Sequence, residues 1–189
     1  TAHSLGRKVA AHAHAADGIN AALRAGVNSI EHGSFLDDES VILFKNTDAY
    51  LVPTLLAGVH MSEEMEVNKN IPPAIVDKIK HVVPVVEASF KRAVNGNVNI
   101  AFGTDSGVSK HGTNAREFEL MVNYGMGNEE AIKTATINAS ELLGMSSQIG
   151  TIETGKSADI IAVYGDPLTD ITFLKNVQFV MKEGKVYKK

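Results

Sequence analysis

The 189-residue sequence contains no cysteine and no tryptophan, and it has only four tyrosines and seven phenylalanines. Without cysteine there is no disulfide framework and no thiolate zinc site, so any metal must be held by imidazole and carboxylate groups. The formal net charge is −4, with both signs interspersed and no basic stripe. This charge pattern and the few aromatic rings exclude nucleic acid as the expected partner.

Long hydrophobic runs are also missing. Charges interrupt every apolar stretch well before the roughly 20 residues that a membrane helix needs, so no membrane partner is expected. The N-terminus lacks the charged-then-apolar layout of a signal peptide, which leaves the localisation open and the cytoplasm as the default expectation. A hydrophobic content of 44% is nevertheless enough for a buried core.

Short β-rich runs alternate with helical runs from Arg7 onward, which predicts βα units around a parallel sheet, the α/β class. The predicted strands are Lys8–Ala13, Val27–His32, Tyr50–Leu55 and Val98–Thr104. The predicted helices are Gly18–Ala25 capped by Asp17, Asp37–Lys45, Ala74–Val94, Ala115–Tyr124, and Glu129–Leu143 capped by Asn128.

Three further segments carry specific expectations. Thr1–Gly6 has the pattern of a last helical turn closed by a glycine. Met61–Pro72 is polar and long enough to suggest a functional loop or lid. Pro84 is expected to kink the helix that contains it, or to split that helix near Val83.

The pattern changes near Gly150, where short strands joined by glycine turns begin. Residues 150–189 therefore predict a small antiparallel β module, with Glu183-Gly184 as a hairpin turn. Residues 1–149 supply only four βα units, and a closed (β/α)₈ barrel needs eight. We expect half a barrel, whose exposed strands need the missing half, a second copy of the chain or another cover.

Metal-competent side chains stand at the ends of three predicted strands. Asp105 follows an apolar run and precedes a Gly/Ser loop, and His12, His14 and His32 stand at the ends of two earlier runs. Catalytic groups of parallel α/β barrels lie at such strand ends. We therefore predict a zinc-type site formed by His12, His32 and Asp105, with one position open for water. His12 is preferred to His14 because it still lies within the apolar run.

The remaining candidates have weaker support. Glu31 precedes His32 and is expected to face the helix layer as a salt-bridged carboxylate. His111 stands on the loop after Asp105, and either contacts substrate or lies in solvent. His60 lies on the long segment after the third strand, where an exposed histidine is usually without function. With His14, these two histidines complete the set of candidate substrate-binding residues.

Asp105 is expected to have two roles. If its carboxylate contacts both a metal and the bound water, it can take the proton of the water during attack and deliver it to the leaving group. A bound metal lowers the pKa of that water from about 15.7 toward 7, which makes hydroxide available at neutral pH.

Five stretches of the chain resemble the C-terminal part of metal-dependent amidohydrolases of the imidazolonepropionase-related group, which includes Xaa-Pro dipeptidase-like enzymes. These stretches are Val9–His14, Ala25–Gly33, Phe102–Ser106, Ala131–Ser140 and Gly155–Ile161. The resemblance implies strands five to eight of a (β/α)₈ barrel, followed by half of a β-sandwich.

The same resemblance implies roles for single residues. His12 and His32 would bind the second ion of a divalent pair, with zinc as the expected metal, and Asp105 would bind the first and act as acid and base. The family's first-strand His-x-His pair and bridging carboxylated lysine have no counterpart in these residues, so they are expected to lie on an absent segment.

Three functions remain open from the sequence. The first is a hydrolase of an amide-type C–N bond in a peptide-like or cyclic amide substrate, complete only with the absent N-terminal half. The second is a non-catalytic half-barrel that binds metal or assembles with another chain. The third is a lactonase-like or phosphotriesterase-like hydrolase that uses the same activated water.

Overall fold

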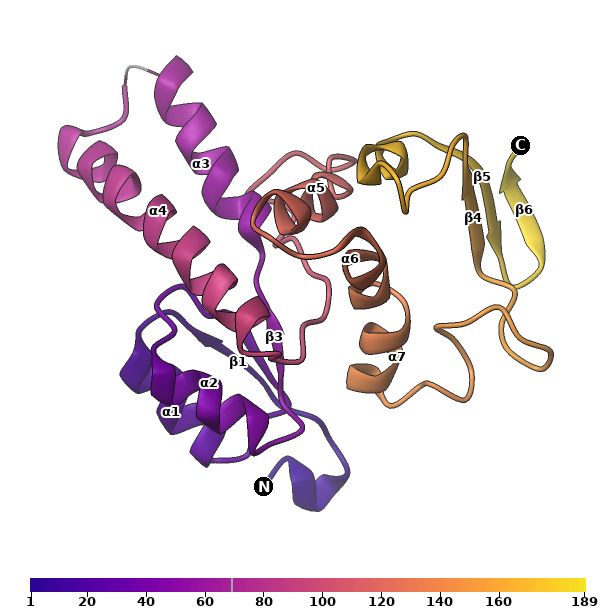
Figure 1. Ribbon diagram of the computed structural model, residues 1–189, viewed down its shortest axis with the longest axis horizontal. Helices are drawn as coiled ribbons and strands as arrows, with labels where there is room; N and C mark the ends of the chain where they lie inside the picture. The colour runs from indigo at the N-terminus through magenta and orange to yellow at the C-terminus, as the bar shows by residue number, and fades with distance from the viewer. Residues whose placement is uncertain (69) are drawn as a thin grey trace.

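The computed structural model describes residues 1–68 and 70–189 (Figure 1). A parallel sheet contains β1 (Ala10–Ala13), β2 (Ser29–His32) and β3 (Tyr50–Val52), in that order. The helices are α1 (Ala16–Arg24), α2 (Asp38–Lys45), α3 (Leu55–Val67), α4 (Pro73–Asn95), α5 (Arg116–Asn123), α6 (Asn128–Thr134) and α7 (Ile137–Leu143). An antiparallel sheet of β4 (Ile160–Val163), β5 (Val177–Lys182) and β6 (Lys185–Lys188) follows, and 3₁₀ turns cover His3–Leu5 and Ile171–Lys175. No helix in the described ranges is both long and apolar enough to cross a membrane.

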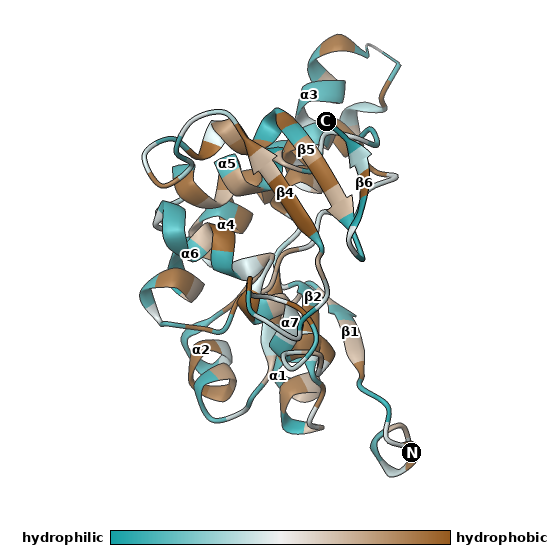
Figure 2. Cartoon of the chain, turned by 90° about the vertical axis from the view of Figure 1, so that its right-hand side faces the viewer, coloured by the Kyte–Doolittle hydropathy of each residue, from teal (hydrophilic) through white to brown (hydrophobic). Residues whose placement is uncertain are grey.

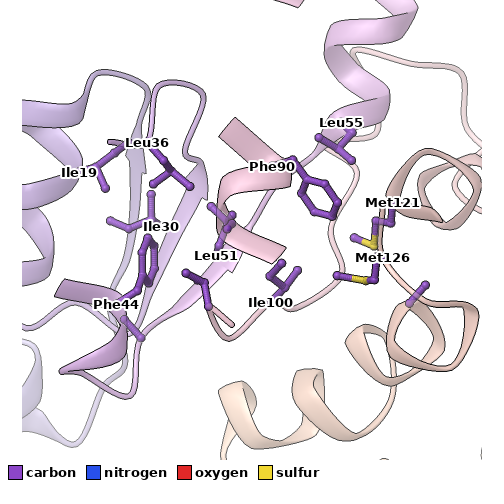
Figure 3. Packing of buried hydrophobic residues seen from close by; sticks show 14 of the residues in the cluster. Ile19, Ile30, Leu36, Phe44, Leu51, Leu55, Phe90, Ile100, Met121 and Met126 are labelled. Atoms are coloured by element: carbon purple, nitrogen blue, oxygen red, sulfur yellow. The ribbon is translucent and has the colours of Figure 1, made fainter. Parts of the chain in front are cut away.

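The main core lies between the parallel sheet and its helices. Register pairs Ala11 with Ile30 and Ile30 with Leu51, so these residues form a row on one face of the sheet. This face packs against helix side chains such as Phe44 and Phe90 (Figure 3). The opposite face of the sheet therefore carries the residues that alternate with this row, including His12.

Ile30 provides a direct test of this packing. The side chain is fully buried, so Ile30→Val should lower the free energy of unfolding by about 0.5–1.5 kcal/mol in urea denaturation. Ile42→Val on α2 is the matched control, because Ile42 is 58% exposed and should lose less than about 0.5 kcal/mol. Equal losses at the two positions would contradict the assigned core.

The fourth predicted strand, Val98–Thr104, is wrong in extent, because it shrinks to a single parallel bridge between Leu51 and Ile100. Asn99 and Ala101 keep backbone hydrogen bonds to Leu51 of β3, and other hydrogen bonds of the segment go to α6 and α7. The amide of Phe102 donates to the carbonyl of Thr134, and the side-chain amide of Asn138 donates to the carbonyl of Ile100. The described parallel strands form an open sheet, and its place in a half-barrel stays a prediction.

The single helix predicted over Glu129–Leu143 is wrong, because the same contacts divide it into α6 and α7. Because the carbonyl of Thr134 accepts from Phe102, it leaves the helical ladder, and Thr136 takes non-helical angles of φ −121° and ψ −91°. Gly127 occupies the N-cap position that was predicted for Asn128, and the side chain of Asn128 donates to the carbonyl of Leu168 instead.

The predicted loop Met61–Pro72 is also wrong over most of its length, because α3 continues to Val67. Methionine and glutamate are good helix formers, so a polar composition did not indicate a loop here. The predicted strand at Tyr50–Leu55 is correspondingly shorter, since Leu55 already begins α3. Figure 1 shows α3 and α4 side by side. Helix α4 continues through Pro84, so the predicted split near Val83 does not occur, and the alternative of a kink stays a prediction.

The C-terminal module has the predicted antiparallel character. Glu183 and Gly184 join β5 to β6 with φ values of 50° and 77°, the two positive angles that a type I′ hairpin turn requires. Figure 2 shows hydrophobic colour along β4, where Ile161 is 55% exposed. The predicted last turn before Gly6 is confirmed as a short 3₁₀ turn closed by this glycine at φ 66°.

Candidate metal site

Three histidines meet at the ends of β1 and β2. The ring centroid of His12 lies 4.7 Å from that of His14 and 4.5 Å from that of His32, and the other two rings are stacked at 4.8 Å. One ligand atom from each residue lies within 4.8 Å of the other two. The structure thus brings together the predicted pair His12 and His32 and adds His14. We call these three residues the histidine cluster.

Backbone geometry at His32 makes this cluster possible. In a regular strand His32 would share the helix-facing side with Ile30, because side chains alternate along the strand. His32 instead has φ 71°, in the left-handed region that non-glycine residues rarely adopt. This turn breaks the alternation and brings the ring of His32 beside that of His12.

Buried contacts hold the loop that follows His32. Gly33 also has a positive φ of 56°, and an added Cβ would lie 2.4 Å from Cδ1 of Leu51, so this position favours glycine. The hydroxyl of Ser89, buried on α4, donates to the carbonyl of Gly33 and accepts from the amide of Leu36, each at 2.9 Å. The backbone conformation at the end of β2 is therefore fixed from the helix layer.

Two hydroxyl groups orient two of the imidazoles. Nδ1 of His14 lies 2.7 Å from Oγ of Ser34, and Nδ1 of His32 lies 2.8 Å from Oγ1 of Thr54. A hydroxyl that accepts from Nδ1–H fixes the tautomer in which Nε2 carries the free lone pair, as a metal ligand requires. The donor chemistry of the cluster therefore fits a divalent ion that accepts imidazole nitrogen.

The electrostatic surroundings of His14 and His32 favour the neutral, unprotonated imidazole. Burial lowers the pKa of His14, and the nearby His32, His12 and Lys78 lower it further. Burial and His12 also lower the pKa of His32, whereas the negative charge of Asp105 acts in the opposite direction. Neutral imidazole is the form that binds metal, so these shifts support ligand competence near neutral pH.

Asp105 lies close enough to act on His32 electrostatically, but among the described residues the compact group of potential ligands consists of the three histidines. It has φ 51°, so its backbone is left-handed like that of His32. Beside it, the side-chain amide of Asn114 donates to the hydroxyls of Thr104 and Ser106, at 3.1 and 3.0 Å. Its predicted roles as ligand and acid–base group stay predictions.

The other two predicted histidines lie outside the cluster. His60 lies on α3, with Nε2 3.9 Å from Oε1 of Glu64, and lines an open pocket of about 280 Å³ together with Lys110 and Arg116. His111 is exposed on the loop after Asp105. Substrate contacts by His14, His60 and His111 stay predictions.

Glu31 departs from its expected position. It is paired in register with His12, so it shares the face of His12 and points away from the helix layer. Its carboxylate accepts from the hydroxyl of Ser29 at 2.6 Å, and no ion pair of Glu31 occurs in the described part of the chain. The expected salt bridge is therefore wrong. The ring partners Ser34 and Thr54 were not predicted either, and a hydroxyl residue just past each strand end was the only sequence signal for them.

The lowered pKa of His32 predicts a specific pH dependence of the metal-free chain. As the pH falls through about 6.5, the imidazole of the unfolded state takes up a proton before that of the folded state, so the free energy of unfolding decreases. In His32→Asn, which tolerates a left-handed backbone, this contribution should be absent. Urea denaturation of both proteins between pH 5 and 8 checks this, and parallel curves would contradict the assignment.

Known protein families and curated proteins include relatives of this chain. The model of the Amidohydrolase family matches residues 1–187. Ochratoxinase from Aspergillus niger is 33% identical over 188 residues, covering 96% of this chain and 38% of the relative. Imidazolonepropionase from Thermoplasma volcanium is 35% identical over 101 residues, covering 53% of this chain and 22% of the relative.

Among solved structures, a Xaa-Pro dipeptidase with bound methionine in the active site matches with a TM-score of 0.94 and 44% identity. The match covers all of this chain and 46% of that one. The chain thus spans less than half the length of these relatives. The resemblance seen in the sequence is confirmed, and the chain belongs to the amidohydrolase family.

Proposed function

We propose that the chain supplies part of a divalent-metal centre that hydrolyses an amide-type C–N bond in a peptide-like or cyclic amide substrate. The observation that carries this proposal is the histidine cluster, with its two rings oriented by Ser34 and Thr54. The similarity to a Xaa-Pro dipeptidase structure supports the choice of a peptide-like substrate.

In this proposal His12 and His32 hold one ion through their imidazole nitrogens, and Asp105 contributes a carboxylate oxygen to the centre. Zinc is the proposed metal, present as one ion or a pair, because imidazole and carboxylate suit it. When bound, such an ion supplies Lewis-acid activation of water. The family's bridging lysine and His-x-His pair would come from residues outside these 189.

The chemical step assigned to this chain is proton transfer. A carboxylate oxygen of Asp105 takes the proton of the attacking water and passes it to the nitrogen of the leaving amine, which departs as the C–N bond breaks. His14, His60 and His111 are proposed to contact substrate. Thr54 and Ser34 keep their imidazoles in fixed orientations throughout.

The proposed fold follows from the same comparison. Residues 1–149 would be half of a (β/α)₈ barrel, and residues 150–189 part of a β-sandwich. In the described sheet β1 is an edge strand, and its Ala10 and His12 are exposed. An open edge of this kind needs a cover, and we propose an upstream half or a second copy of the chain.

The test is hydrolysis by the chain alone and by the chain combined with an upstream half from a related enzyme, each with and without Zn²⁺. A Met-Pro dipeptide, a cyclic amide, a lactone and a phosphotriester are the substrates. We expect zinc-dependent cleavage of an amide substrate only when both halves are present. Turnover of the lactone or phosphotriester alone would replace the proposal with the third function, and a chain that neither binds zinc nor hydrolyses any substrate would support a purely structural role.

A further inference from the structure

Thr54 connects the histidine cluster to helix α3. Its side chain is 7% exposed, and Oγ1 lies 2.8 Å from Nδ1 of His32. Its backbone has φ 49° and ψ 44°, a left-handed conformation that is costly for a β-branched residue. Thr54 is also the N-cap residue of α3, so the backbone turn that begins this helix determines where the hydroxyl points.

The side chain of the N-cap residue of α3 does not bond to its own helix. Threonine is a preferred N-cap residue because its hydroxyl can accept from an amide in the first helical turn. Thr54 makes no such bond, and its hydroxyl is hydrogen-bonded to His32 instead. The helix therefore needs another acceptor for its first amide groups.

Glu117 on α5 supplies that acceptor. Its Oε1 accepts from the amide of Leu55 at 2.8 Å, and its Oε2 accepts from the amide of Leu56 at 2.7 Å. The side chain is fully buried, and burial raises its pKa to about 7 against the opposing effect of these two hydrogen bonds. Burying a carboxyl group is costly, and no lysine or arginine in the described residues forms an ion pair with it.

We propose that Glu117 is a positioning residue for the metal centre, which acts on His32 through Thr54. By holding the first two amides of α3, Glu117 lets the hydroxyl of Thr54 leave the helix and accept from Nδ1–H of His32. Nε2 of His32 is then left as the ligand atom. This inference rests on the proposed function, because it assigns His32 to a metal.

The experiment is a Co²⁺ titration of the 189-residue chain, followed by the visible absorption of the bound ion, with a thermal melt of every variant. Thr54→Val removes the hydroxyl at nearly constant volume and should weaken Co²⁺ affinity roughly 10–100-fold, the usual loss when a hydrogen-bond partner of a metal-binding histidine is removed. Thr54→Ser keeps the hydroxyl and should restore binding. Glu117→Gln offers one acceptor oxygen for two amides and should weaken affinity roughly tenfold.

A double variant and a control variant distinguish a positioning role of Glu117 from a general loss of protein stability. If Glu117 acts through Thr54, the Glu117→Gln, Thr54→Val protein should bind Co²⁺ no more weakly than Thr54→Val alone. Met121→Ala is the matched control, because Met121 is equally buried on the same helix, but its sulfur accepts from the hydroxyl of Thr134 and not from the first amides of α3. It should lower the melting temperature and leave Co²⁺ affinity unchanged.

Each result has a definite consequence. Failure of the wild-type chain to bind Co²⁺ would overturn this inference, whereas the proposed function would be overturned by a lack of zinc-dependent hydrolysis when both halves are present. Normal binding by the wild type and by Glu117→Gln would overturn the inference alone, as would an equal loss of affinity in Met121→Ala. Where Glu117→Gln does not fold, Glu117→Asp takes its place, since this shorter carboxylate cannot span both amides, and unchanged affinity in that variant would also overturn the inference.

Discussion

Asp105→Asn in the assembled, zinc-loaded enzyme should lower kcat by roughly 10²–10⁴-fold, which is the usual contribution of general acid–base catalysis. An asparagine oxygen can still coordinate a metal, but the amide cannot take up the proton of the attacking water. The left-handed backbone at φ 51° is compatible with asparagine, so the loop should keep its conformation. Steady-state kinetics, together with zinc content by atomic absorption, measure the two effects separately.

Asp48→Asn is a suitable control, because Asp48 is exposed just before β3, at the opposite end of the strand from the proposed site. It should leave both kcat and zinc content unchanged. A near-normal kcat for Asp105→Asn with full zinc content would reduce Asp105 to a ligand at most and would contradict the proposed proton transfer.

The sequence predicts those parts of the fold that depend on local patterns. An apolar run ending in a histidine indicated both β1 and β2, and Glu183-Gly184 indicated the hairpin turn. Such features follow from side-chain periodicity and from the backbone preferences of single residues. The proposed histidine ligands were accessible for the same reason, since each stands at the end of a recognisable strand.

Features that depend on distant contacts were not accessible from the sequence. The segment around Ile100 bonds to Thr134 and Asn138, which lie more than 30 residues away in the chain, and no local pattern indicated these partners. Glu117 reads as an ordinary charged residue at the start of a helix, and only the fold brings it to the amide of Leu55, 62 residues earlier. The left-handed turn at His32 is likewise held from α4 by Ser89, which no local pattern indicated.

The direction in which His32 points illustrates this difference. Strand alternation alone places His32 on the side of Ile30 and would separate it from His12. The prediction that His12 and His32 meet rested on the strand ends, and the structure brings them together through a positive φ that the sequence did not indicate. Glu31 was assigned to the wrong face by the same reasoning, because regular alternation was assumed up to the last residue of β2.

Single substitutions in the histidine cluster should show which rings bind the ion. Loss of a residue that is hydrogen-bonded to a metal ligand usually weakens metal affinity by roughly 10–100-fold. His12→Asn and His32→Asn should each weaken zinc affinity by at least this much, because each removes a proposed ligand itself. His14→Asn should have a smaller effect on affinity, since His14 follows the last residue of β1 and is proposed to contact substrate. Asparagine at all three positions keeps a polar side chain and, at His32, tolerates the left-handed backbone.

Competition of each variant with a chromogenic zinc chelator at pH 7.5 gives the three affinities under one condition. Substrate contact by His14 further predicts that His14→Asn raises KM in the assembled enzyme while its zinc content stays near that of the wild type. Loss of affinity in His14→Asn equal to that in His12→Asn would mean that all three imidazoles bind the ion, and the preference for His12 over His14 would then be wrong. A loss in His14→Asn with none in His12→Asn would exchange their assigned roles and place the metal closer to Ser34.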